Sequence, residues 1–116
     1  MGRKIAMFVF NGEPLCFVHV MLNALDLHEK GHDVKVIMEG SATGLIRELA
    51  DPDAPFAGLF SKMKSEGLIE CACKACANKM GSAADAKEQQ IELCAEMSGH
   101  PAMSRYMKKG YEILTF

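Results

Sequence analysis

"KIAMFVFNGEPLCFVHVMLNALDLHEKGHDVKVIMEG", residues 4–40, is the stretch that decides the fold. It begins with a continuous apolar run over residues 4–10, which is typical of a strand buried on both faces. A proline near the start of the next segment and a glycine after it predict a helix over residues 14–30. The segment over residues 33–40 is rich in Val and Ile and predicts a second strand. The stretch therefore predicts a strand, a helix and another strand in succession.

The rest of the chain continues this alternation. The same signals predict further helices and strands, with helices over residues 41–50, 55–67, 74–81 and 99–110 and strands over residues 68–73 and 111–116. Residues 82–97 are ambiguous, because their first half favours a helix and "IELC", residues 91–94, fits either a short strand or a continued helix. The pattern predicts a single α/β domain over residues 1–116, with a mostly parallel sheet covered on both faces.

Composition narrows the functional classes. A chain of 116 residues that is 49% hydrophobic has room for one compact core. Its formal charge of −2 gives no overall attraction for nucleic acid or for an anionic membrane. The apolar start is shorter than a secretory signal, and no apolar run is as long as a membrane span. We therefore expect a cytoplasmic protein that binds neither nucleic acid nor membrane.

The first predicted helix has an unusually narrow polar side. Its polar positions are spaced four, three and four residues apart and form one stripe, made of His19, Asn23, Asp26 and Lys30. The rest of the helix is apolar, so it needs to be covered on more than one side. A partner chain is one way to provide that cover.

Three predicted loops meet where a ligand would bind. In open parallel sheets, ligands collect beyond the carboxyl ends of the strands, where helix N-termini converge. The candidate ligand-binding residues follow the first three strands and are Asn11, Gly12, Glu13, Glu39, Gly40, Ser41 and Lys74. The two glutamates are candidates for a general acid and base, although carboxylates at such positions are also often solvated or cap a helix.

The third loop carries a cluster of cysteines. Cys71, Cys73 and Cys76 lie within six positions, in a chain with an odd total of five cysteines. Such a count in a cytoplasmic protein favours thiol chemistry or metal binding over structural disulfides. Cys73 falls at the strand-to-helix junction, where the helix dipole and Lys74 favour a thiolate, so it is the candidate nucleophile. Cys76 has the spacing of a resolving thiol, and Cys71 is expected to be buried in the strand.

Two other interpretations of the cluster were weighed. A tetrahedral metal site would need Cys94 or His100 as a further ligand, but the second ligand pair of a typical zinc site is missing, so we expect no metal. A thioredoxin-like disulfide exchanger stays open, because Cys73 and Cys76 form a Cys-x-x-Cys pair at a helix start. His100 precedes a proline at a predicted helix start, which favours capping, and Cys16 and Cys94 are expected in the core.

The sequence resembles the DsrE/DsrF-like family in four motifs and in their order along the chain. These motifs span nearly the whole chain and are "KIAMFVFNGEP", "VKVIMEGSATGLI", "GLIECACKACANKMG" and "GHPAMSRYMKKGYEILTF". The resemblance implies a three-layer α/β/α domain with a five-stranded parallel sheet, the DsrEFH-like fold. It also implies assembly into homo-oligomers, such as trimers or hexamers, or into hetero-oligomers with paralogues.

The resemblance also implies a role for one cysteine. In sulfurtransferase members of the family, a cysteine eight residues before a glycine carries sulfane sulfur as a persulfide, and here Cys73 lies eight residues before Gly81. The first hypothesis is a sulfur-relay protein without a cofactor, which takes sulfur from a donor protein and passes it to an acceptor. Cys76 departs from the simplest family pattern and would resolve the persulfide. The alternative is a non-catalytic oligomeric module that binds a ligand or partner, with structural or redox-sensing cysteines.

Overall fold

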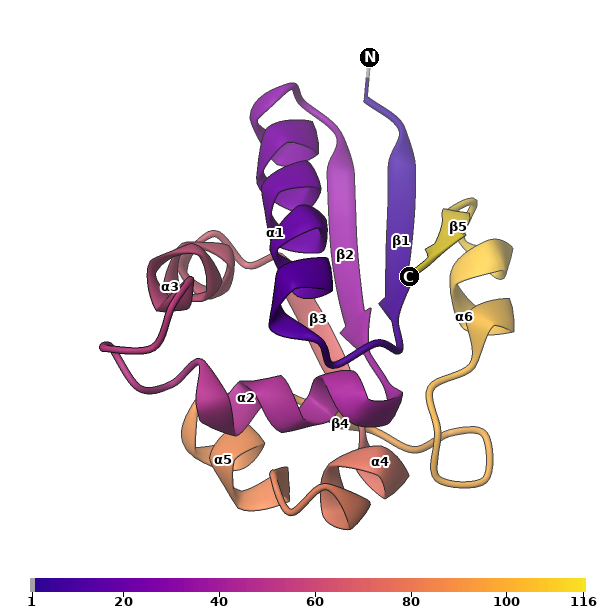
Figure 1. Ribbon diagram of the computed structural model, residues 1–116. Helices are drawn as coiled ribbons and strands as arrows, with labels where there is room; N and C mark the ends of the chain where they lie inside the picture. The colour runs from indigo at the N-terminus through magenta and orange to yellow at the C-terminus, as the bar shows by residue number, and fades with distance from the viewer. Residues whose placement is uncertain (1) are drawn as a thin grey trace.

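The computed structural model describes residues 2–116 (Figure 1). Its strands are β1 (Lys4–Val9), β2 (Asp33–Met38), β3 (Ile69–Cys73), β4 (Leu93–Cys94) and β5 (Glu112–Thr115). Its helices are α1 (Pro14–Glu29), the 3₁₀ helix η1 (Gly40–Gly44), α2 (Leu45–Glu48), α3 (Ala57–Ser65), α4 (Lys74–Lys79), α5 (Ala83–Glu88) and α6 (Met103–Lys108). Among these residues, no helix is long and apolar enough to cross a membrane.

The five strands form one parallel sheet in the order β4-β3-β2-β1-β5. The pairing of β1 with β2 is unbroken from Lys4 opposite Asp33 to Val9 opposite Met38. The three central strands are therefore flanked on both sides, and their carboxyl ends lie at one edge of the sheet. The predicted α/β class with a five-stranded sheet is confirmed.

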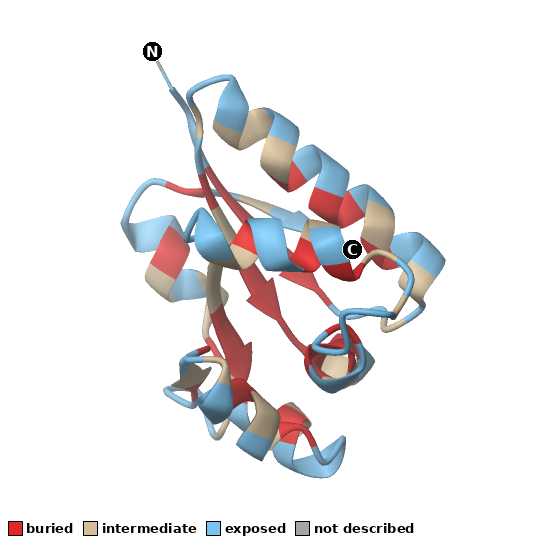
Figure 2. Cartoon of the chain, turned by 90° about the vertical axis from the view of Figure 1, so that its left-hand side faces the viewer, coloured by how far each residue is buried: buried red, intermediate tan, exposed pale blue. Residues whose placement is uncertain are grey.

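Helices cover the two faces of this sheet unequally. One face carries the larger core, where α1 and α3 pack Phe17, Met21 and Phe60 against the strands. The other face carries a smaller core of Phe8, Cys71 and other side chains under α6. Figure 2 shows the buried strands between the outer helices, whose outward surfaces are exposed. The sheet with its two coverings makes the predicted three-layer α/β/α arrangement.

A β-bulge interrupts the pairing of β3 with β2 just before the cysteines. Val36 pairs with Ile69 and Ile37 pairs with Cys71, so Glu70 is the additional residue. Glu70 accepts a hydrogen bond of 3.0 Å from the hydroxyl of the fully buried Tyr106. The strand is thereby tied to α6 immediately before the cysteine cluster.

Most element predictions are confirmed, with differences at the ends. The ambiguous segment contains both α5 and the short strand β4, and the helix predicted over residues 99–110 begins only at Met103, because the N-cap Ala102 after Pro101 has extended backbone angles of φ −99° and ψ 127°. The helix predicted over residues 41–50 begins as the 3₁₀ helix η1. The prediction that Cys16 lies in the core is wrong, since the buried side of α1 comprises Phe17 and Val20 and leaves Cys16 exposed.

We expect Phe8→Ala to destabilise the fold more than any exposed truncation. Phe8 is fully buried and its ring meets that of Tyr106 edge to face at a centroid distance of 5.6 Å. Removing it leaves a cavity, which costs about 3–5 kcal/mol of unfolding free energy, measured by urea denaturation. Met107→Ala is the control, because Met107 is 63% exposed and its loss should cost under about 0.5 kcal/mol. Equal losses in the two variants would contradict this assignment of the core.

Candidate functional site

The site begins where β3 passes directly into α4. Cys73 is the last residue of β3 and the N-cap of α4, with extended backbone angles of φ −63° and ψ 121°. Its sulfur accepts a hydrogen bond of 3.4 Å from the backbone N–H of Cys76. A capping side chain satisfies an N–H group that a helix start leaves free, so the helix start fixes the direction of the Cys73 side chain.

A loop after the neighbouring strand β4 brings a histidine to this sulfur. Met97 and His100 form an antiparallel bridge, with hydrogen bonds of 2.8 and 3.0 Å between their backbones. Gly99 lies between them at φ 94°, and its carbonyl oxygen accepts a hydrogen bond of 2.9 Å from Ala75 at the start of α4. A Cβ on Gly99 would lie 3.3 Å from the Cβ of Ala75, so the loop and the helix are closely packed. The loop is thus fastened to the same helix that presents the cysteines.

The three side chains meet in one cluster. Sγ of Cys73 lies 3.0 Å from Nδ1 of His100, and Sγ of Cys76 lies 3.9 Å from the same nitrogen. The three ligand-type atoms all lie within 4.8 Å of one another. A thiol within hydrogen-bond reach of an imidazole is the arrangement that activates cysteine nucleophiles. Cys73 and His100 are therefore arranged as a nucleophile and base pair would be, with Cys76 as a second thiol beside them.

The protonation of Cys73 differs from the expectation of a thiolate. Burial raises the pKa of the Cys73 thiol to about 11; the backbone N–H of Cys76 lowers it, whereas the Cys76 side chain and Glu39 raise it further. Desolvation penalises the charged form, and this outweighs the single N–H at the start of a short helix. At neutral pH the thiol is therefore protonated, and a base has to remove the proton. His100 is placed to do so, which replaces the capping role predicted for it, since the N-cap of α6 is Ala102.

Glu39 lies at the same edge of the sheet. It follows β2 and is only 7% exposed. Burial raises the pKa of its carboxyl group, while the interaction with His100 lowers it and that with Glu96 raises it. Glu39 also lines a cavity of about 340 Å³ together with Phe10, Met97 and Pro101. Its role as a general acid stays a prediction.

The other predicted ligand residues divide into two groups. Gly12 donates a hydrogen bond of 2.9 Å to the hydroxyl oxygen of Ser41, which connects the first two loops. Ser41 and Gly40 line a cavity of about 320 Å³ with Cys76, so this group lies beside the cluster. Asn11 and Glu13 lie instead at the start of α1, where the backbone N–H of Glu13 donates a hydrogen bond of 2.8 Å to Oδ1 of Asn11.

The last predicted site residue, Lys74, and the two remaining buried cysteines lie outside the cluster. Lys74 is exposed at the start of α4. Cys71 and Cys94 are buried, as predicted, and burial raises the pKa of both thiols. Their position under α6 makes them packing residues.

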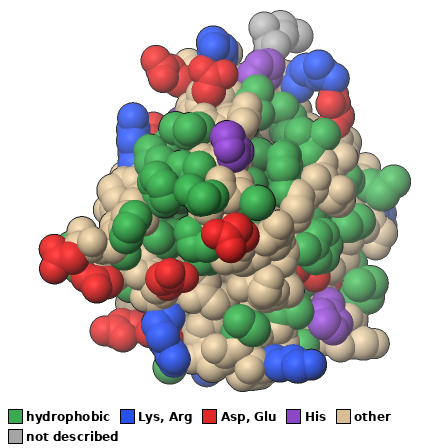
Figure 3. Space-filling model, in the orientation of Figure 1, with side chains coloured by type: hydrophobic (Ala, Val, Ile, Leu, Met, Phe, Trp, Pro, Cys, Tyr) green, Lys and Arg blue, Asp and Glu red, His purple; other side chains and the backbone are tan. Residues whose placement is uncertain are grey.

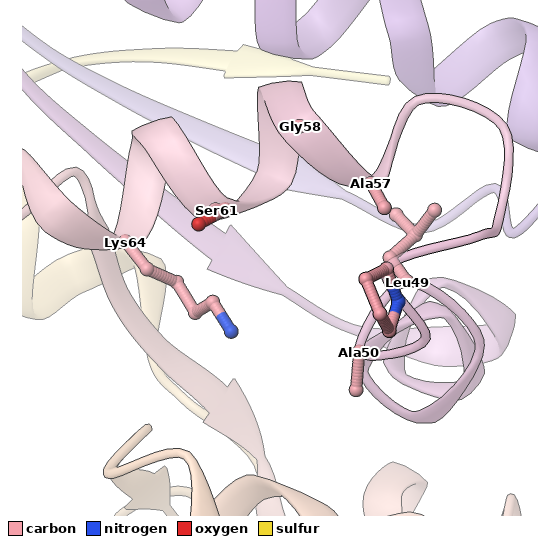
Figure 4. Close-up of a pocket in the computed structure, with 7 residues that line it drawn as sticks. Leu49, Ala50, Ala57, Gly58, Ser61 and Lys64 are labelled. Carbon is pink, nitrogen blue, oxygen red and sulfur yellow. The ribbon is translucent and has the colours of Figure 1, made fainter.

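Another hollow of similar size elsewhere on the surface contains none of these side chains. Figure 4 shows this pocket of about 310 Å³, which lies between the end of α2 and α3 and is lined by Leu49, Ala57, Ser61, Lys64 and neighbours. Lys64 donates a hydrogen bond of 2.8 Å to Gln89 and lies 5.0 Å from the ring centroid of Phe60. These contacts explain the lysine structurally, and we place the site at the cysteines.

A parallel α/β domain with a cysteine and histidine cluster beyond its strand ends is the class defined by this fold and site. A comparison with models of protein families identifies the family of this chain. The model of the DsrE/DsrF-like family matches residues 4–116, and the chain belongs to that family.

Similar proteins extend across archaea and bacteria. An uncharacterized protein of Methanocaldococcus jannaschii is 31% identical over 97 residues, which cover 84% of this chain and 77% of the relative. An uncharacterized protein of Archaeoglobus fulgidus is 42% identical over 43 residues, 37% of this chain and 70% of the relative. A solved structure of a conserved protein of unknown function from Bacteroides thetaiotaomicron has a TM-score of 0.71 at 18% identity, covering 97% of this chain and 95% of that one. This last likeness shows the shared fold.

We expect alkylation of Cys73 to be strongly pH dependent. Iodoacetamide reacts with the thiolate, so with a pKa of about 11 the rate should rise about tenfold per pH unit from neutrality toward that value. Peptide mass spectrometry after timed labelling measures the rate at Cys73, and the exposed Cys16 is the internal reference. A rate that is already constant near pH 7 would show that Cys73 rests as a thiolate and would contradict the raised pKa.

Proposed function

We propose that this protein is a sulfur-relay protein that carries sulfane sulfur as a persulfide on Cys73. Membership of the DsrE/DsrF-like family supports the sulfur-relay class. The observation that carries the proposal is the distance of 3.0 Å between Sγ of Cys73 and Nδ1 of His100. This pair supplies the two groups that the first chemical step needs, a thiol and a base.

The loading step is a thiol attack on a donor persulfide. Nδ1 of His100 takes the proton from Cys73 while Sγ of Cys73 attacks the terminal sulfur of a donor R–S–SH. The S–S bond of the donor breaks, and the departing thiolate takes the proton back from His100 and leaves as R–SH. Cys73 becomes Cys73–S–SH, and no net oxidation occurs.

Two routes then remove the bound sulfur. In relay, a thiolate of an acceptor protein attacks the terminal sulfur and Cys73 returns to a thiol. In reductive release, Cys76 attacks Sγ of Cys73, which forms a Cys73–Cys76 disulfide and frees H₂S; a dithiol reductant must then restore both thiols. The sulfur atoms of Cys73 and Cys76 lie within 4.8 Å of each other, so a small movement would bring them close enough for the second route.

Access to Cys73 is controlled by one loop. Cys73 is fully buried, whereas Cys76 is partly exposed. Atoms of the loop cover the buried sulfur, with the carbonyl oxygen of Gly99 at 3.6 Å and the imidazole of His100 at 3.0 Å. A donor therefore reaches Cys73 only when this loop moves. The loop both covers the sulfur and carries the base His100. Closure of the loop would then shield the persulfide from water and from other thiols.

We expect a reduced sample of the protein to gain the mass of one sulfur atom after incubation with a small persulfide or polysulfide donor. Intact mass spectrometry under anaerobic conditions measures the gain. Cys73→Ser should abolish the adduct, because the acceptor is lost, and Cys16→Ser should retain it. Cys76→Ser should keep the adduct for longer, since the resolving thiol is absent.

His100→Gln tests the base in the same assay. It should slow loading on the order of 10²-fold at neutral pH, with an unchanged circular dichroism spectrum. An adduct that persists in Cys73→Ser would overturn the acceptor assignment. Failure of the wild-type chain to form any adduct would favour the alternative, a non-catalytic ligand- or partner-binding module.

We also propose that the chain forms a homo-oligomer through α1 and β5. Leu15 on α1 is 64% exposed and Phe116 after β5 is 42% exposed, and Cys16 and Phe116 line one shallow cavity of about 220 Å³. Figure 3 shows hydrophobic side chains gathered over the face that carries α1. The edge strand β5 adds backbone groups without a neighbouring strand. Contiguous exposed apolar surface of this kind marks interaction sites.

Sedimentation at micromolar concentration tests the oligomer. The wild-type chain should have a mass above that of the monomer, and Leu15→Glu should shift it toward the monomer by placing a charge in the apolar interface. Met107→Glu is a matched control, because Met107 is exposed to nearly the same extent, 63%, but lies on α6. A monomeric wild-type chain would contradict the proposal.

A further inference from the structure

We propose that Cys73, Cys76 and His100 form a binding site for a thiophilic d¹⁰ metal ion, Zn²⁺ or Cu⁺. This inference goes beyond the proposed sulfur relay and does not depend on it. The three side chains come from two segments that lie 24 residues apart in sequence and meet through the fold. Their ligand atoms already lie together in the absence of any protein rearrangement.

The distances between the ligand atoms are near those of a tetrahedral site. With Zn–S bonds of about 2.3 Å and Zn–N bonds of about 2.0 Å, tetrahedral geometry places neighbouring ligand atoms roughly 3.5 to 3.8 Å apart. Here the two sulfur-to-nitrogen distances are 3.0 and 3.9 Å, and all three separations are within 4.8 Å. Movements of about 1 Å or less at each side chain would therefore complete the geometry.

The ligands are held in place by the backbone around them. Cys73 is fixed as the N-cap of α4, and His100 is fixed by its bridge to Met97. The carbonyl oxygen of Gly99 joins the loop to Ala75 in that helix. A metal ion would bind to side chains whose directions are set before it arrives, so little ordering cost opposes binding.

The chemical type of the ligands selects the metal. Two thiolates and an imidazole are preferred by Zn²⁺ and Cu⁺, whereas Mg²⁺ and Ca²⁺ require oxygen ligands. Both thiols lose their protons to solvent on binding, which gives a neutral site with Zn²⁺. Three protein ligands also leave the fourth position open, as in zinc sites that bind water or a substrate. The cavity beside Cys76, lined by Lys79 and Met80, gives solvent access on that side.

The sequence argued against a metal because a second ligand pair is missing. The structure places His100, one of the two further ligands that the sequence offered, next to Cys73 and Cys76, so three ligands meet without a second ligand pair. A metal ion on Cys73 would occupy the thiolate that accepts sulfur. Metal binding and persulfide formation would therefore exclude each other at the same atom.

Titration of the reduced full chain with metal tests the site. Purified under anaerobic conditions and freed of metal, the chain should bind one Zn²⁺ or one Cu⁺, counted by elemental analysis after dialysis in separate arms. Co²⁺ serves as a spectroscopic probe, and thiolate charge-transfer bands with tetrahedral ligand-field bands are expected. The arm with the tighter binding identifies the ion.

Variants assign the ligands. Cys73→Ser, Cys76→Ser and His100→Ala should each weaken binding at least about tenfold. Cys16→Ser and His19→Ala should bind as the wild-type chain does, because both residues are exposed on α1. Circular dichroism checks that each variant is folded, and the rise in melting temperature on adding metal gives a second measure of binding. Substoichiometric binding of both ions, or binding unchanged in His100→Ala, would overturn the proposal.

Cys76→Ser separates this inference from the proposed function. It removes a metal ligand but keeps the sulfur acceptor and its base. The variant should therefore lose metal binding and still form the persulfide on Cys73. Loss of metal binding with retained sulfur loading supports both assignments, and failure of one leaves the measurement of the other intact.

Discussion

The parallel pairing of β1, β2 and β3 is the constraint on which the rest of the structure depends. Because every strand runs in the same direction, the segments that follow them emerge at one edge of the sheet. The loop after β2 brings Glu39, the end of β3 brings Cys73, and the loop after β4 brings His100. Covering both faces with helices buries the strands and leaves this edge as the place where polar side chains gather.

Burial at this edge gives the cluster its chemistry. In water a thiol is partly ionised near neutral pH, but the desolvated Cys73 holds its proton to about pH 11. The cost of forming its thiolate is met by a base 3.0 Å away, or by a cation that binds the thiolate directly. In the two proposals, sulfur loading and metal binding would be two ways of stabilising the same buried charge. Cys76 would take part in both, as a resolving thiol or as a ligand.

The loop that carries His100 connects chemistry with access. It is fastened to α4 by the hydrogen bond between Ala75 and Gly99, and it covers the sulfur that a donor has to reach. Access for a donor therefore requires this loop to move away from the sulfur while His100 stays within reach of Cys73. In the proposed relay, docking of the donor and activation of the thiol would both depend on this short segment. The end of β3 holds Cys73, and the loop after β4 holds both its base and its cover.

The sequence alone determined the strand and helix order, the position of Cys73 at the end of β3 and the burial of Cys71. These features depend on local patterns: apolar runs, a proline, glycines and the spacing of two cysteines. It named His100 only as a candidate ligand of a metal site that it did not expect, not as a base for Cys73, and it placed the exposed Cys16 in the core. Which side of α1 faces the sheet, and which loop lies over the β3 end, depend on packing between segments far apart in the chain. The short strand β4 carries the histidine to the site, and only its pairing with β3 in the folded sheet brings the two together.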